Sequence, residues 1–296
     1  MRRSDAIRLV ALSAIWGSSF IFIRVLAPVL GPILTVTTRV LIGGAVLVAY
    51  CRIIGLDAEV GRHWRQYAVI GIVNSTLPFM LFAFAALYLP ASYSVILNST
   101  APLFTALWAI PLLNESLTHT KLVGLVAGAA GVVLVSRAGP VVPDSWFWIA
   151  VLACLGATTC YALSSIYMKK RAAHLKPLAI AGWSQMFAGV ALLPFLSFAK
   201  PSGPLTPLIA FNVLMLALFC SSIAYVLYYR LIADIGPTRA LTMAFLMPVF
   251  GMLWGALFLG EPITLAMIAG CALIIAGATA VLRPARPVST LAPRRL

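Results

Sequence analysis

Arg39 is the first residue to consider for its chemistry, because it is the only arginine well inside one of the long apolar stretches of this chain. Its guanidinium stays protonated and offers five N–H donors. An ionisable group at membrane depth is costly and is by default a functional hypothesis, here a contact to a solute or to a gate. The alternative is structural, with Arg39 bonded to backbone carbonyls or extended towards the surface.

Aromatic and amide side chains lie in the same kind of stretch. Trp16 and Tyr161 fall in the first stretch of each half of the chain, where two rings could wall a cavity, although helix packing is the alternative for each ring. Asn74 and Asn98 need a partner in lipid, from a neighbour, water or a ligand, whereas Ser and Thr can bond to their own helix. The candidate substrate-binding residues are Trp16, Ser19, Arg39, Asn74, Asn98, Tyr161, Ser164, Gln185 and Tyr225.

Three prolines, Pro78, Pro102 and Pro248, lie inside apolar stretches. Each leaves an upstream carbonyl without its helical hydrogen bond, so the helix kinks. A kinked helix can line a cavity, and these prolines are candidate gate or hinge residues. A fixed bend without motion is the alternative.

Catalytic chemistry finds little support in the sequence. His63, His119 and His174 all fall in expected loops, and no His, Asp or Glu group has metal-ligand spacing. The five cysteines lie in or at the ends of apolar stretches without a C-x-x-C pair, which is typical of small buried hydrophobes. We therefore expect no enzyme, no metal and no cofactor, with an intramembrane enzyme kept as the weaker alternative.

The composition indicates that lipid is the solvent. Of 296 residues, 62% are hydrophobic and only 9% are charged, and a soluble fold of this length needs a more polar exterior. The net charge of +14 does not indicate nucleic acid, because the basic residues lie between apolar stretches, as topology determinants do. The fold expected is an all-α polytopic membrane protein.

Ten stretches are long enough to cross a bilayer, which takes about 20 apolar residues. Breaks rich in Pro, Gly and Asn separate them. Lys and Arg concentrate on one side of the resulting topology, which places both termini in the cytoplasm by the positive-inside rule. The ten stretches are 6–27, 32–52, 66–88, 91–113, 119–137, 146–168, 177–198, 208–231, 238–259 and 263–282.

An internal repeat divides the chain. Sliding the sequence by 146 places 102–135 over 248–281 without a gap and aligns Pro, Trp, Glu, Thr and Gly in order. Five stretches per half is an odd number, so the halves must be inverted, an arrangement typical of carriers with a midplane site. The expected units are a five-helix repeat at 1–140, an inverted repeat at 141–285 and a cytoplasmic tail at 286–296.

The chain resembles the ten-helix EamA-type members of the drug/metabolite transporter superfamily over residues 6–283. The resemblance rests on the run 14–20 (AIWGSSF), on Arg39, and on 247–249 (MPV) through 259–264 (LGEPIT) with its first-half echo ending at Asn114 and Glu115. It departs at Asn114, where the family usually has glycine. The resemblance implies export or exchange of amino acids and related metabolites by alternating access, through a central cavity between the repeats.

Several alternatives stay open. Another solute, such as a drug, sugar or nucleotide-type metabolite, would suit the same polar groups, while a channel would need a filter motif that the sequence lacks. All seven acidic residues fall in loops or at stretch ends, which favours facilitated diffusion or exchange over proton coupling. We expect a monomer in a bacterial-type inner membrane, with a small-molecule substrate and lipid as its partners and no nucleic acid.

Overall fold

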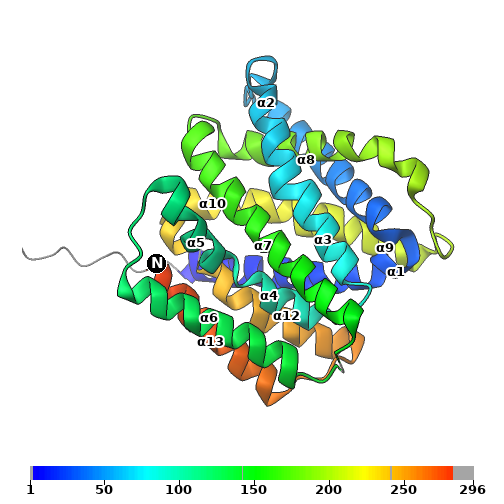
Figure 1. The fold of residues 1–296 in the computed structure, drawn as a ribbon. Coiled ribbons are helices and arrows are strands. Elements are labelled where there is room, and N and C mark those ends of the chain that lie inside the picture. Colours follow the sequence, from blue (N-terminus) through cyan, green and yellow to red (C-terminus); the bar gives the residue numbers. More distant parts are fainter. Residues whose placement is uncertain (1–2, 142, 241, 283–296) are drawn as a thin grey trace, which may run out of the picture.

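The computed structural model describes residues 3–141, 143–240 and 242–282, and within these residues the chain is helical and contains no strand (Figure 1). A helix satisfies its own backbone groups, which an apolar surrounding requires. The expected tail at 286–296 lies outside the described residues. The elements are α1 (Arg3–Ile53), α2 (Val60–Gly71), η1 (Ile72–Thr76), α3 (Leu77–Ala85), α4 (Ala91–Asn98), α5 (Ala101–Leu113), α6 (His119–Ala138), α7 (Ser145–Arg171), α8 (Pro177–Leu192), η2 (Leu193–Phe198), α9 (Pro207–Leu214), η3 (Met215–Ile223), α10 (Ala224–Ile235), α11 (Pro237–Ala240), α12 (Met243–Leu259) and α13 (Leu265–Leu282).

The helices long and apolar enough to cross a membrane number eight in the described residues, and α12 is a ninth, shorter apolar helix. The all-helical membrane fold is therefore confirmed, whereas ten separate helices are not seen. The expected stretches 6–27 and 32–52 both belong to α1, and the stretch 238–259 is divided between α11 and α12. Large side chains on the helix surfaces, such as Leu265, Phe258 and Val126, are well exposed, as expected for a surface in contact with lipid.

α1 is interrupted at Gly31, which has φ 75° and ψ 159° and is the one non-helical residue inside the element. Glycine adopts positive φ without steric cost, and Pro32, which follows it, has no N–H to donate to a helical hydrogen bond. The two arms of α1, 3–30 and 32–53, consequently run in different directions in Figure 1.

Of the three prolines predicted to kink helices, two lie in the first turn of a helix and one lies inside a helix. Pro78 and Pro102 are each the second residue of a helix, α3 and α5, where a missing N–H costs nothing. Pro248 lies inside α12. Pro78 and Pro102 nonetheless lie inside the membrane-length spans Val60–Ala85 and Ala91–Leu113, as predicted. The helix is already irregular before each of them, at π-helical η1 before Pro78 and at Ser99 and Thr100 before Pro102.

α6 and α13 form the most extensive helix pair and lie side by side along one edge of the bundle (Figure 1). Glycines make the close approach possible. A Cβ placed on Gly124 would lie 2.7 Å from the carbonyl oxygen of Gly277, and one on Gly131 would lie 2.6 Å from that of Gly270. This pair borders the bundle, and the other helices surround the interior that holds the candidate site.

Candidate functional site

A cavity of about 430 Å³ lies between α1, η1, α3, α4, α5, α7, α10 and α12, and Leu282 at the end of α13 also borders it. Its wall is mostly apolar and rich in aromatic residues, which suits the binding of a small organic molecule. Among the described residues, Arg39 is the only charged residue that lines it. The aromatic residues of the wall are Trp16, Phe20, Phe79, Phe82, Tyr161, Tyr225, Tyr228 and Phe245.

The predicted substrate-binding residues mostly meet at this cavity. Ser164 and Gln185 are the exceptions and are treated below, and among the predicted hinge prolines only Pro102 borders the cavity. Whether these residues bind a solute stays a prediction. The predicted residues that line the cavity are Trp16, Ser19, Arg39, Asn74, Asn98, Tyr161 and Tyr225.

Ser164 and Gln185 do not line the cavity. Ser164 is buried with no hydrogen-bond partner for its hydroxyl, while the next residue, Ser165, borders the cavity, because successive helical residues point about 100° apart. Gln185 packs in the contact between α8 and α1, and its amide nitrogen donates to the carbonyl of Ala181 at 3.1 Å. The orientation of each helix therefore keeps both side chains out of the cavity wall.

Arg39 is held by a side chain 182 positions away. Its Nε donates to the Ser221 hydroxyl at 3.2 Å, and its guanidinium carbon lies 3.8 Å from the centre of the Phe79 ring, within range of a cation–π interaction. Ser221 belongs to η3, where its hydroxyl also donates to the carbonyl of Leu216, five residues earlier. π-helical segments are often found at functional sites.

Trp16 and Tyr161 wall the cavity from different sides. The Trp16 ring lies 5.7 Å from the Tyr225 ring and 5.2 Å from the Tyr228 ring, and its Nε1 donates to the carbonyl of Cys220 at 3.1 Å. The Tyr161 ring stacks on Phe82 with a centroid separation of 6.3 Å. Each ring therefore packs against a neighbouring helix and faces the cavity as well, so packing and cavity lining are not exclusive.

The sequence predictions missed most of the aromatic wall, namely Phe20, Phe79, Phe82, Tyr228 and Phe245. A spacing signal existed, because Phe79 and Phe82 are three residues apart, as are Tyr225 and Tyr228, and such pairs share one helix face. In an apolar chain the same spacing marks any packed face, so the pattern alone could not separate cavity from core.

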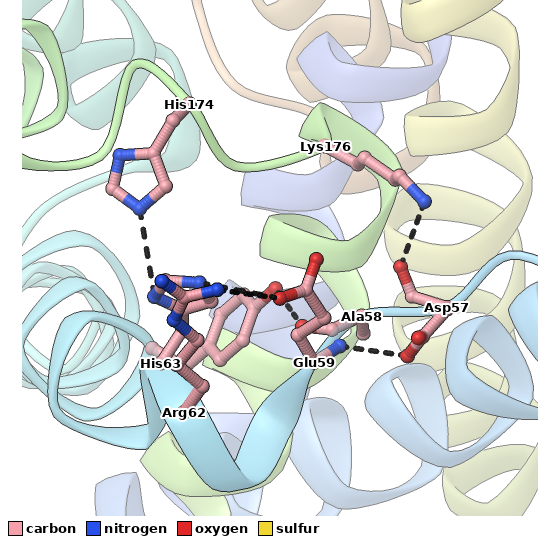
Figure 2. Close-up of polar contacts among 8 residues, drawn as sticks. Asp57, Ala58, Glu59, Arg62, His63, His174 and Lys176 are labelled. Carbon is pink, nitrogen blue, oxygen red and sulfur yellow. Dashed lines mark hydrogen bonds and ion pairs between the residues drawn. The ribbon is translucent and has the colours of Figure 1, made fainter.

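A second polar cluster joins the loop between α1 and α2 to the loop between α7 and α8, away from the cavity (Figure 2). His63 and His174 lie 3.5 Å apart between ring nitrogens, and Lys176 donates to the carbonyl of Asp57 at 3.0 Å. Glu59 pairs with Arg62 at 3.5 Å. The described residues contain no group of three or more His, Cys, Asp or Glu placed to hold a metal. The cluster fastens two loops together.

Two glutamates at the ends of apolar stretches, Glu115 and Glu261, form an ion pair and a helix cap. Glu115 pairs with Lys121 at 2.9 Å. The Glu261 carboxylate accepts the backbone N–H groups of Ala91 and Ser92, at 2.7 and 2.9 Å, at the start of α4. An acidic group at a helix N-terminus satisfies free N–H donors and favours the helix dipole. Neither glutamate lines the cavity.

An apolar helical bundle around a solute-sized cavity is the architecture of many membrane transporters, and sequence comparison identifies the family. The model of the EamA-like transporter family matches residues 6–137 and again 148–283. The chain belongs to the EamA-like transporter family, which confirms the resemblance seen in its sequence.

Related proteins match over nearly the whole chain. The uncharacterized transporter YvbV of Bacillus subtilis is 27% identical over 91% of this chain and 88% of its own length. Protein PecM of Dickeya dadantii is 28% identical over 88% of this chain and 86% of its own length. A solved crystal structure with 21% identity superposes with a TM-score of 0.66 and covers 95% of this chain and 97% of that one. At that identity the likeness concerns the fold alone.

Proposed function

We propose that the protein moves small organic metabolites, with amino acids as the leading class, across a bacterial-type inner membrane by alternating access. The observation that carries this proposal is the central cavity of about 430 Å³, whose wall combines eight aromatic residues with amides and one arginine. Such a cavity has the size and mixed lining of a small-molecule site. In this proposal the protein acts as a monomer, with a small solute and lipid as its partners and no nucleic acid.

The proposed division into inverted repeats, 1–140 and 141–285, is supported by helix contacts that map onto one another when the sequence is shifted by 146 positions. Gly124 contacts Gly277, and Gly131 contacts Gly270. Adding 146 converts Gly124 into Gly270 and Gly131 into Gly277, so each contact maps onto the other. A two-fold axis between α6 and α13 produces this reciprocity. The family model also matches the chain twice.

Contacts around the cavity exchange in the same way. Trp16 packs against Tyr228, and Tyr161 packs against Phe82. Tyr161 is the repeat equivalent of Trp16, 145 positions later, and Tyr228 is that of Phe82, 146 positions later. Each ring contact therefore corresponds to the other. The π-helical segments η1 and η3 also correspond. The two arms of α1 can be counted as two spans, and α11 together with α12 as one span. Each half then has five spans, which is the ten-helix arrangement.

The cavity lining supports an inward-facing state, given that both termini are cytoplasmic. Leu282 at the end of α13 and Met243 at the start of α12 border it, and both lie at the end proposed to be cytoplasmic. At the opposite end, the N–H of Ser202 donates to the carbonyl of Val29 at 2.8 Å, and Glu261 binds the start of α4. Alternating access then requires those contacts to separate.

The test is solute flux with the purified protein in proteoliposomes, across a panel of amino acids, nucleotides, sugars and cationic drugs. We expect saturable counterflow of at least one amino acid. Saturable flux of a sugar or nucleotide alone would keep the transporter and replace the substrate class. Folded protein that exchanges no member of the panel above empty liposomes would contradict the proposal.

A further inference from the structure

The cavity holds one buried charge among the described residues, and what it implies for the substrate rests on the transport function proposed above. Arg39 is only 6% exposed, and its charge lies in a mostly apolar cavity wall that is rich in aromatic residues. All seven acidic residues of the chain lie in its described part, and none of them lines the cavity. The protein therefore supplies a buried cation there without a counter-ion, a strongly unfavourable arrangement unless another group pairs with it.

The hydrogen bonds of Arg39 leave most of its donors available. Nε bonds to Ser221, and a guanidinium has four further N–H donors on its two terminal nitrogens. Within the described residues, no hydrogen bond joins either terminal nitrogen to the protein. The Phe79 ring compensates the charge only in part, because a cation–π contact is weaker than a paired carboxylate.

Arg24 on the same helix shows what a structural arginine does in this bundle. Its Nη1 donates to the carbonyl oxygen of Ala86, just after the end of α3, and it does not line the cavity. Arg39 donates to no backbone carbonyl in the described structure, so the structural interpretation that fits Arg24 does not account for Arg39. A guanidinium with two free parallel N–H groups, one on each terminal nitrogen, matches the two oxygens of a carboxylate.

The rest of the wall limits what can carry that carboxylate. Trp16 and Tyr225 on one side, and Phe82 and Tyr161 on the other, present rings to the cavity, and such surfaces favour a planar or apolar body. A substrate ammonium would find no carboxylate here, and it would be repelled by Arg39. We propose that the site selects organic anions, binding one carboxylate through Arg39 and an aromatic or apolar body between the rings, and that an amino group on the substrate adds nothing to binding.

Three compounds with one phenyl body test this proposal: 3-phenylpropanoate, phenylalanine and 2-phenylethylamine. They are an anion, a zwitterion and a cation, and their binding to the full chain in lipid nanodiscs can be measured by calorimetry. We expect the acid to bind at least as tightly as the amino acid, and the amine to bind weaker by at least about 10-fold, the loss of one charge-assisted pair. This wild-type series needs no variant to fold.

Variants then assign the preference to Arg39. Arg39→Gln should weaken binding of the acid by roughly 10- to 100-fold and bring the acid and the amine to similar affinity. Arg39→Lys should keep part of the preference, because the charge stays while the paired N–H geometry is lost. Arg52→Gln is the matched control, since Arg52 lies on the same helix, is exposed and does not line the cavity.

Equal binding of the amine and the acid, an amino acid bound tighter than the acid by about 10-fold or more, or an acid preference that persists in Arg39→Gln would overturn the inference. Failure of all three compounds to bind would also overturn it, because the aromatic body is part of the proposal. Flux of another solute in the proteoliposome panel would leave the transport function standing in each of these cases. Only absent flux across the whole panel removes the transport function itself.

Discussion

Arg39 and Arg24 are two arginines on α1 with opposite energetic roles. Arg39 has a hydroxyl and an aromatic ring as its neighbours, and Arg24 satisfies a backbone carbonyl. A buried charge without a counter-ion lowers stability, whereas a donor that satisfies a buried carbonyl raises it. Functional sites commonly keep a residue that lowers stability, as the buried charge of Arg39 does.

We predict that Arg39→Met raises the free energy of unfolding by about 1 kcal/mol or more, because the buried charge is removed. Arg24→Met should lower it by about 1–2 kcal/mol, because the carbonyl of Ala86 loses its donor. Thermal unfolding of the two variants in one detergent measures both changes. A lower unfolding temperature for Arg39→Met than for Arg24→Met would contradict this assignment of roles.

Glu115 provides a pH-dependent contact in the loop between α5 and α6, outside the spans. The hydrogen bond from the Lys121 ammonium, assisted by its charge, lowers the pKa of the Glu115 carboxyl from its ordinary value. A carboxyl with a lowered folded pKa contributes stability that is present above its unfolded pKa, about 4.3, and is lost as pH falls through the folded pKa. Because the side chain is 40% exposed, the contribution is small.

The matching prediction compares wild type with Glu115→Gln. The difference in unfolding temperature should be constant from pH 7 to about pH 5 and should shrink as pH falls below about 4. Thermal scans in one detergent at several pH values measure it. A difference that stays constant down to pH 3 would show that the ion pair does not contribute to stability.

At the scale of elements, the contact between α6 and α13 depends on glycine. A Cβ on Gly131 would meet the carbonyl oxygen of Gly270 at 2.6 Å and the Ile274 side chain at 2.8 Å. Both distances are too short for a carbon atom, so one helix would have to move away from the other. On α7, by contrast, a Cβ on Gly156 would make only an ordinary contact of 3.5 Å with Leu81.

We therefore predict that Gly131→Ala lowers the free energy of unfolding by about 1–3 kcal/mol through overpacking. Gly156→Ala is the control and should be neutral or stabilising by up to about 1 kcal/mol, because alanine favours the helix. Unfolding in a denaturant series compares the two variants. Equal effects would mean that α6 and α13 do not need the close approach.

At the scale of the whole molecule, the distribution of Lys and Arg predicts that residues 139–145 and both termini lie on opposite sides of the membrane. Reporter fusions after Ala138 and at the two termini should therefore give opposite signals. A cytoplasmic signal after Ala138 would give an even number of spans in the first half. The halves could then not be inverted, and the proposed exchange of contacts between them would lose its basis.

The second whole-molecule prediction concerns energy coupling. Because no acidic side chain of the chain lines the cavity, and arginine stays protonated, the cavity offers no group suited to carry a proton between the two sides. A substrate gradient alone should drive flux in proteoliposomes without a pH gradient. Uphill accumulation under an imposed pH gradient, abolished by a protonophore and retained in Glu115→Gln and Glu261→Gln, would contradict this prediction.

The solvent, the helical class and the family all followed from the amino-acid sequence alone. Long apolar stretches with few charged residues are stable as helices surrounded by lipid. The positions of Pro and Gly between the stretches mark most of the helix ends. The positions of Arg39, Asn74 and Asn98 at the cavity were also predictable, because an arginine or asparagine is costly against lipid and so points inward.

Which face each helix turns to the interior became visible only when the helices were placed against one another. Ser165 replaces Ser164 at the cavity because one residue rotates the side chain by about 100°. The aromatic residues of the wall also pack in the hydrophobic core, so their type alone does not mark a cavity. The bond between Arg39 and Ser221 joins positions 182 apart, and no local pattern encodes such a distance. Periodicity describes one helix at a time, whereas a cavity is defined by how several helices are placed against one another.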